Sequence, residues 1–214
     1  GAVDDATGSY DGTVTGATRG VPGKIEDAFY FDGDGDDVEE TTYVGTMENM
    51  AISFWVKFNE TDVAQDVIMS DDVNKWGCRM KDSNHEDVSG VLSCRYAGSA
   101  YVYLDTPVLE PQRWYHVIFS TLSKENRLWL DGNLVAESDL AFTAATKSWT
   151  GLSIGKYYSG SGNLNATLDE IGIWSKPFSS ADATNLYNSF NGTPYTDFTT
   201  DTAIVDDATG NYDA

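Results

Sequence analysis

Four aspartates lie within the six residues 32–37, whose sequence is DGDGDD. Carboxylates held this close repel one another, and a Ca²⁺ ion, which takes six to eight oxygen ligands, removes that cost. The two glycines relax the loop, so that backbone carbonyls can also turn toward the ion. The segment predicts a calcium site, and a solvated acidic loop is the alternative. Its glycine and glutamate spacing does not match an EF-hand.

Aromatic residues that could stack on the C–H faces of sugars gather in the middle of the chain. A jelly roll would place them on its concave sheet or rim, and the segment 156–165 is rich in Gly, Ser and Asn like adaptable recognition loops. The candidate ligand-binding residues are Trp76, Tyr96, Tyr101, Tyr103, Trp149, Tyr157 and Tyr158. Core packing or ordinary surface exposure is the alternative for each ring.

Cys78 and Cys94 flank the polar stretch 81–90, and each is followed by an arginine. This pattern predicts two strands joined by a long loop, with the cysteines near its base. A disulfide there would close a loop of about 15 residues, contribute about 3 kcal/mol in the chain-entropy model, and suit an oxidising compartment. Two buried free thiols are the alternative. A zinc site is not expected, because neither His85 nor His116 has a CxxC partner.

Short β-branched or aromatic runs bounded by Gly, Asp, Asn or Ser recur along the chain, and this pattern predicts strands. We therefore expect strands to position the residues described above. The expected strands are 28–31, 50–58, 91–96, 100–104, 114–121, 127–130, 134–137, 152–154 and 168–174. Asp131-Gly132 predicts a tight hairpin. A serine cap after Pro177 predicts one helix at 179–187. The fold class expected is an all-β, two-sheet antiparallel sandwich with one short C-terminal helix.

A nine-residue segment occurs twice: 3–11 (VDDATGSYD) recurs as 205–213 (VDDATGNYD), with eight of nine positions identical. The offset of 202 residues is the size of a whole domain rather than a solenoid period. We expect one domain over 1–195, with 196–214 as a linker or the start of the next repeated module. A tail that adds an edge strand to a neighbouring copy is the alternative.

The charge of the chain restricts its partners, since 34 Asp and Glu face 13 Lys and Arg, for a formal net charge of −21. Duplex DNA and anionic lipid would be repelled, and no apolar run approaches the roughly 18 residues of a membrane span. We therefore expect no nucleic-acid partner and no membrane insertion. Divalent-cation sites, a halophilic source in which salt screens the self-repulsion, and an acidic extracellular protein stay open as explanations.

Five segments follow one another along the chain: 31–39 (FDGDGDDVE), 52–57 (ISFWVK), 114–117 (WYHV), 128–132 (LWLDG) and 168–174 (LDEIGIW). Taken in this order, they resemble the laminin G-like domains of the concanavalin A-like jelly rolls. The resemblance implies two sheets packed face to face, with one face and the rim loops available for ligands. It also implies calcium held by Asp32, Asp36 and Asp169, with Asp34 as a further candidate.

Catalysis is not expected from these residues. Glycosidases of this fold place two carboxylates on one strand, facing the same way. Here Asp169 and Glu170 are adjacent, so their side chains point to opposite faces of a strand. His116 lies in the aromatic strand as a packing residue, and His85 lacks a nucleophile partner.

The sequence thus predicts a non-catalytic, calcium-stabilised adhesion or recognition module that is extracellular or lies on a cell or virion surface and contacts a cell-surface glycan or glycoprotein. A structural repeat that contacts copies of itself, and an accessory domain beside a polysaccharide-degrading enzyme, are the alternatives.

Overall fold

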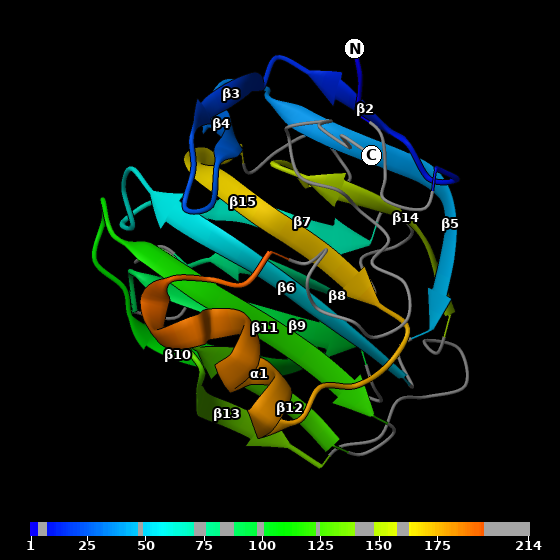
Figure 1. Ribbon diagram of the computed structural model, residues 1–214, viewed down its shortest axis with the longest axis vertical. Helices are drawn as coiled ribbons and strands as arrows, with labels where there is room; N and C mark the ends of the chain where they lie inside the picture. Colours follow the sequence, from blue (N-terminus) through cyan, green and yellow to red (C-terminus); the bar gives the residue numbers. More distant parts are fainter. Residues whose placement is uncertain are drawn as a thin grey trace.

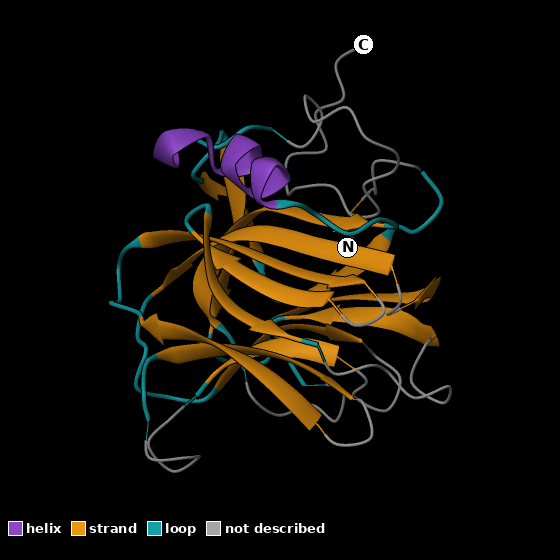
Figure 2. Ribbon diagram, turned by 90° about the horizontal axis from the view of Figure 1, so that it is seen from below, coloured by secondary structure: helices purple, strands orange, loops and turns teal. Residues whose placement is uncertain are grey.

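The computed structural model describes residues 1–3, 8–46, 49–70, 76–81, 88–97, 101–122, 125–139, 148–157 and 163–194. Within these residues two antiparallel sheets pack face to face (Figure 1). The helix lies outside the two layers of strands (Figure 2). The predicted all-β sandwich with a short C-terminal helix is confirmed.

One sheet has eight strands among the described residues. In spatial order they are β1 (Ala2–Val3), β2 (Gly12–Thr15), β5 (Asp37–Thr46), β14 (Ser148–Ile154), β7 (Gln65–Ser70), β8 (Trp76–Met80), β9 (Val91–Ala97) and β10 (Tyr101–Val108). The other sheet has seven: β13 (Asn133–Ser138), β12 (Glu125–Leu130), β11 (Trp114–Leu122), β6 (Asn49–Phe58), β15 (Asn165–Trp174), β4 (Asp27–Asp32) and β3 (Thr18–Pro22). β11, β6 and β15 run side by side at the centre of the second sheet.

Successive side chains of a strand point to opposite faces of the sheet, so one cross-strand row of side chains in the eight-stranded sheet points into the core. Successive cross-strand partners in that row are Val14, Val38, Ile154, Ile68, Cys78, Cys94 and Leu104. All of them are buried in a single apolar cluster with the inner face of the other sheet. Cys78 and Cys94 form a disulfide between β8 and β9, with Cα atoms 4.0 Å apart.

The helix α1 (Ser180–Tyr187) covers the outer face of the seven-stranded sheet. Ser179 caps it in a reciprocal pair with Asp182, which satisfies backbone N–H groups at its start. Its buried residues Ala183 and Leu186 pack against a second apolar cluster that includes Trp129 and Trp174. This contact explains why large apolar residues occur on both faces of the strands in this sheet. A short 3₁₀ turn, η2 (Asn188–Phe190), follows the helix.

The expected strands all occur, with shifts of a few residues at their ends, although Ala100 lies outside the described residues. The Asp131-Gly132 hairpin is confirmed, with φ angles of 50° and 76° at the two positions. Strands β1, β2, β3, β5 and β7 were not expected, because these segments are polar or lack a clear alternation. None of the helices in the described part of the chain has the length and apolar character to cross a membrane.

Candidate functional site

The acidic segment 32–37 forms a turn stabilised by its own backbone. Asp32 Oδ1 accepts a hydrogen bond from the Asp34 N–H at 2.8 Å, and Asp36 Oδ2 accepts one from the Asp32 N–H at 2.9 Å. Burial raises the pKa of the Asp36 carboxyl, the Asp32 N–H bond lowers it, and the neighbouring negative charges raise it further. Calcium binding by Asp32, Asp34 and Asp36 stays a prediction.

Asp169 does not join these residues. Asp32 of β4 lies opposite Asn165 of β15. Asp169 lies four residues further along β15, so it is about 13 Å away from Asp32 in the direction of the strands. The Oδ2 atom of Asp169 accepts hydrogen bonds from the N–H groups of Lys24 and Ile25, at 2.6 and 2.8 Å. Among the described residues, no three His, Cys, Asp or Glu side chains form a group that could hold a metal. The predicted grouping of Asp169 with the 32–37 segment is therefore corrected.

The structure places the seven candidate aromatic residues in different environments. Trp76, Tyr96 and Trp149 are at most 1% exposed and belong to the apolar core, so their assignment as surface ligand contacts was wrong. Each ring lies on the inner face of its strand, where it fills the space between the sheets. Tyr103 is 42% exposed, and Tyr157 is half-buried. The side chain of Tyr101 and all of Tyr158 lie outside the described residues.

Tyr103 belongs to a polar cluster on the outer face of the eight-stranded sheet. The residues next to the inward-facing cysteines must point outward, and these are Arg79 and Arg95. Arg95 pairs with Tyr103 across β9 and β10, and Arg79 pairs with Asp66 across β7 and β8. We call this the outer-face cluster, and its members are Asp66, Arg79, Lys81, Ser93, Arg95, Tyr103 and Asp105.

Hydrogen bonds and charge pairs order the end of the outer-face cluster that lies on β9 and β10. Asp105 accepts hydrogen bonds from Ser93 Oγ at 2.6 Å and from Lys81 Nζ at 2.9 Å. The same Lys81 ammonium lies 5.4 Å from the centre of the Tyr103 ring, within cation–π range. The exposed ring of Tyr103 and the half-exposed carboxylate of Asp105 are therefore presented to solvent in fixed positions.

Asp66 lies at the buried end of the outer-face cluster. Its side chain is 2% exposed, and its Oδ1 atom lies 3.6 Å from Arg79 Nε, beyond an ordinary hydrogen bond. Burial raises the pKa of the Asp66 carboxyl to about 6, and the positive charges of Arg79 and Arg95 lower it only in part. The positive charges of both guanidinium groups thus act on the one buried carboxylate of Asp66.

The carboxylates of the outer-face cluster are too far apart for glycoside hydrolysis. Asp66 and Asp105 belong to one cross-strand row, with β8 and β9 between their strands. Three interstrand spacings separate them by about 14 Å, whereas a hydrolytic pair lies about 5–9.5 Å apart.

A second pair of carboxylates on this face has a suitable spacing but the wrong electrostatics. Asp37 and Glu39 lie two residues apart on β5, and Lys156 Nζ lies 2.8 and 2.7 Å from their carboxylate oxygens. Burial lowers the pKa of Lys156, but the hydrogen bonds to the two carboxylates outweigh it and raise the pKa overall. Both carboxylates are thus paired with a single ammonium, which occupies the space between them.

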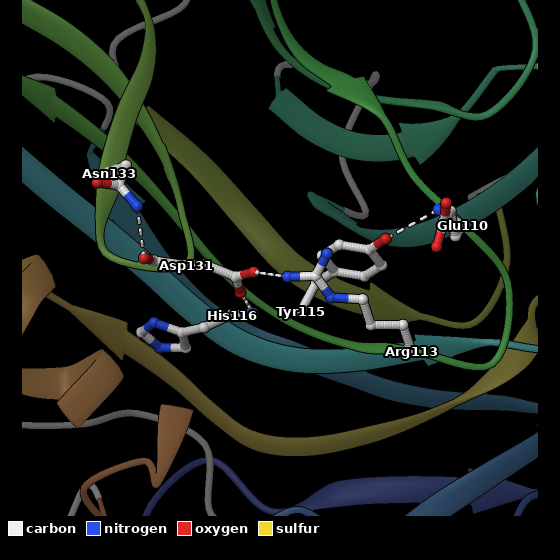
Figure 3. A network of polar contacts seen from close by, with 6 residues as sticks. All are labelled: Glu110, Arg113, Tyr115, His116, Asp131 and Asn133. Atoms are coloured by element: carbon white, nitrogen blue, oxygen red, sulfur yellow. Dashed lines mark hydrogen bonds and ion pairs between the residues drawn. The ribbon is translucent and has the colours of Figure 1, made fainter. Parts of the chain in front are cut away.

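His116 lies in a structural network on the other sheet (Figure 3). Asp131 in the hairpin turn accepts hydrogen bonds from the His116 backbone N–H at 2.9 Å and from Arg113 at 2.8 Å. The His116 ring packs against Trp55, with ring centres 4.9 Å apart. Burial lowers the pKa of His116 to about 3, so the ring is neutral and a weak base at ordinary pH. This agrees with the predicted packing role.

The outer-face cluster has a signal in the sequence that does not involve its aromatic residue. Each cysteine of the disulfide is followed by an arginine, and a cross-strand disulfide that points inward forces both arginines outward. Asp66 could not be found in this way, because the irregular pairing between β7 and β8 shifts its register.

Comparison with known proteins identifies one family. A laminin G-like family model, described as the concanavalin A-like lectin/glucanases superfamily, matches residues 30–184. A search of curated proteins gives no match.

Solved structures share the fold at low sequence identity. Domain 4 of AbnA, a GH43 extracellular arabinanase from Geobacillus stearothermophilus, in complex with arabinotriose, has a TM-score of 0.67 and 18% identity, with 85% of this chain and 90% of that chain covered. The binding domain of Paraclostridial Mosquitocidal Protein 1 has a TM-score of 0.68 and 14% identity, with 86% and 48% covered. The botulinum neurotoxin serotype D ligand binding domain in complex with N-acetylneuraminic acid has a TM-score of 0.66 and 16% identity, with 85% and 47% covered. The chain spans about half the length of these two toxin domains.

Proposed function

The chain belongs to the concanavalin A-like lectin/glucanases superfamily, and we propose that it is a non-catalytic recognition module that binds saccharides through the outer-face cluster. The setting that we propose is extracellular, with a glycan or glycoprotein of a cell surface as the partner. Two of the structural neighbours are complexes with arabinotriose and with N-acetylneuraminic acid, which supports a saccharide ligand for this fold.

The single observation that carries the proposal is the combination of the partly exposed Arg79 and the exposed Tyr103 ring on one outward-facing surface, with the buried Arg95 as the cross-strand partner of Tyr103. Guanidinium groups donate paired hydrogen bonds to carboxylates and to neighbouring hydroxyl groups. The exposed Tyr103 ring adds an apolar surface for the C–H face of a sugar. Positioned donors beside an aromatic ring are the pattern of a specific small-molecule site.

Among the residues of this region that the structure describes, no pair of carboxylates is suited to acid–base catalysis, which favours binding over hydrolysis. The Asp66 and Asp105 carboxylates are too distant, and Asp37 and Glu39 share one ammonium. We therefore propose that the module retains its ligand unchanged.

A glycan array followed by calorimetric titration of the strongest ligand tests the proposal. We expect Tyr103→Ala and Arg79→Ala each to weaken binding about five- to thirtyfold, because each removes a contact worth about 1–2 kcal/mol. Arg79→Lys keeps the charge but loses the planar fork, so it should recover only part of the affinity. The product mixture after long incubation should contain the intact glycan.

Arg127→Ala is the matched control, because Arg127 is a similarly exposed arginine on the opposite sheet. It should bind as the wild type does. Equal losses for Arg127→Ala and Arg79→Ala, or unchanged binding after Tyr103→Ala, would argue against the outer-face cluster as the site.

A further inference from the structure

Three segments of the sequence match the pattern Asn-x-Ser/Thr, which is the acceptor of N-linked glycosylation: 59–61 (NET), 165–167 (NAT) and 191–193 (NGT). The disulfide between Cys78 and Cys94 suits the oxidising compartments of exported proteins, where such asparagines are modified. A modified asparagine must reach solvent in the folded protein, because the attached oligosaccharide is bulky and hydrophilic. The structure distinguishes the three segments by this requirement.

The side-chain amides of Asn59 and Asn165 are both engaged in one polar network. Asn59 Nδ2 donates hydrogen bonds to the Tyr30 hydroxyl at 3.3 Å and to Asn165 Oδ1 at 2.5 Å. Asn165 Nδ2 donates one to Glu60 Oε1 at 3.0 Å, and both asparagines are half-buried. A glycan replaces one of the two N–H hydrogens of an amide, so at Asn59 it would remove a donor that is in use. At either position the sugar would need space that the partners of the amide fill.

Asn191 lies in a different environment, in the turn that follows η2 on the outer face of the seven-stranded sheet. Asn191 is exposed, and its side-chain amide has no hydrogen-bond partner within the part of the chain that the structure describes. Its backbone N–H donates a hydrogen bond to the Asn188 carbonyl at 3.0 Å. The Gly192 N–H donates one to the Tyr187 carbonyl at 3.1 Å. The turn therefore presents the Asn191 amide to solvent from an ordered backbone.

The residue before this amide is an exposed aromatic one. The Phe190 side chain is 39% exposed, although its ring contacts Trp55 and lies 3.8 Å from the Lys24 ammonium. Its φ angle of 71° lies in the left-handed region that bulky residues rarely adopt, so the ring is held there against backbone strain. A sugar attached to the next residue would cover this apolar ring with its C–H face.

We propose that Asn191 carries an N-linked oligosaccharide when the protein is exported. The proposal rests on the extracellular setting proposed above, but not on the outer-face cluster, which lies on the opposite sheet. In the reaction Asn191 Nδ2 loses one proton and forms a bond to the anomeric carbon of a sugar. The bond from that carbon to a lipid-diphosphate carrier breaks, and the diphosphate leaves with the bonding electrons. The co-substrate is thus a lipid-diphosphate-linked oligosaccharide supplied by the exporting cell.

Secretion of the full-length chain from cultured mammalian cells tests the proposal. Release of the oligosaccharides by a peptide N-glycosidase in isotopically labelled water converts each modified asparagine to a labelled aspartate, which peptide mass spectrometry locates. We expect the secreted protein to carry the label at Asn191 several-fold more often than at Asn59 or Asn165. The reason is that chains modified within the polar network fold less stably and are retained by the cell.

Thr193→Ala removes the acceptor pattern while it keeps Asn191, and it should abolish the label there. Thr193→Ser is the matched control, because serine keeps both the hydroxyl group and the pattern, and it should retain the label. Thr193 Oγ1 donates a hydrogen bond to the Asn185 carbonyl at 2.8 Å. Asn191→Gln leaves that bond intact and serves in place of Thr193→Ala if the latter is not secreted.

Secreted protein without label at Asn191, or with equal label at Asn59 or Asn165, overturns the proposal. Saccharide binding is measured separately on the same preparations, and Asn191→Gln should bind as the wild type does. A failure of every preparation to bind saccharides counts against the outer-face cluster and leaves the label at Asn191 as it is.

Discussion

Asp66 and Arg79 face each other across β7 and β8 with a separation of 3.6 Å, and the carboxylate is far more deeply buried than the guanidinium. At this distance the pair gains charge attraction without a full hydrogen bond. Desolvation of Asp66 therefore outweighs the attraction, which is why its pKa rises to about 6 rather than falling.

The raised pKa of Asp66 makes the stability of the fold depend on pH. The unfolded carboxyl releases its proton near pH 4, whereas the folded one keeps it until about pH 6. The free energy of unfolding should therefore fall as the pH rises from 4 to 6, by about 2–3 kcal/mol from this group.

Urea unfolding of the wild type and Asp66→Asn at pH 4 and pH 7 measures this. The wild type should lose stability relative to the variant over that interval, and a constant difference would contradict the shift. Asp105→Asn, at the exposed end of the cluster, is the control.

The buried indole of Trp76 is expected to matter for stability. Trp76 is fully buried and meets Trp149 edge-on, with ring centres 4.9 Å apart. Trp76→Ala should lower the free energy of unfolding by about 3–5 kcal/mol. Tyr103→Ala, at an exposed position, should change it by less than about 0.5 kcal/mol. Urea unfolding of both variants checks this, and similar losses would mean that Tyr103 is not on the surface.

The sequence predicted the sandwich because its central strands carry strong local patterns. The strand predicted from the alternation in 50–58 and the Asp131-Gly132 turn both depend on neighbours in the chain, and both are confirmed. The sites were harder to predict because they depend on register. Trp76 and Tyr103 look equivalent in the sequence, but side chains alternate along a strand, and their positions in that alternation direct Trp76 into the core and Tyr103 toward solvent. Asp169 looked like a metal ligand, yet its position on β15 directs it to the backbone of Lys24 and Ile25.

The high negative charge predicts that salt stabilises the fold. A formal net charge of −21 places many carboxylates within reach of one another, and the screening length falls from about 10 Å at 0.1 M to about 3 Å at 1 M salt. The melting temperature should rise between 0.1 and 1 M NaCl at pH 7. The rise should be smaller at pH 4, where many carboxylates are protonated. A melting temperature that is unchanged or lower in 1 M NaCl at pH 7 would contradict the halophilic interpretation.

Asp169 and Asp32 are expected to respond differently to calcium. Asp169 is 1% exposed, and its carboxylate accepts hydrogen bonds from three backbone N–H groups, those of Lys24, Ile25 and Glu170. Asp169→Asn replaces one acceptor oxygen by an N–H₂ group, so the free energy of unfolding should fall by at least about 2 kcal/mol. This loss should be the same with calcium and with chelator, because these contacts involve no ion.

Asp32→Asn tests the calcium site predicted at 32–37. An ion that binds only the folded state raises the melting temperature by mass action, so a calcium ion held by the 32–37 segment should stabilise the wild type by several degrees. Asp32→Asn should reduce that rise, while Asp169→Asn should retain it, as thermal melting in calcium and in chelator would show. If Asp169→Asn abolishes the rise and Asp32→Asn does not, the ion lies at Asp169, and the separation of these two residues along β15 does not describe the calcium-bound protein. If calcium stabilises none of the three proteins, the DGDGDD segment is a solvated turn held by its own backbone hydrogen bonds.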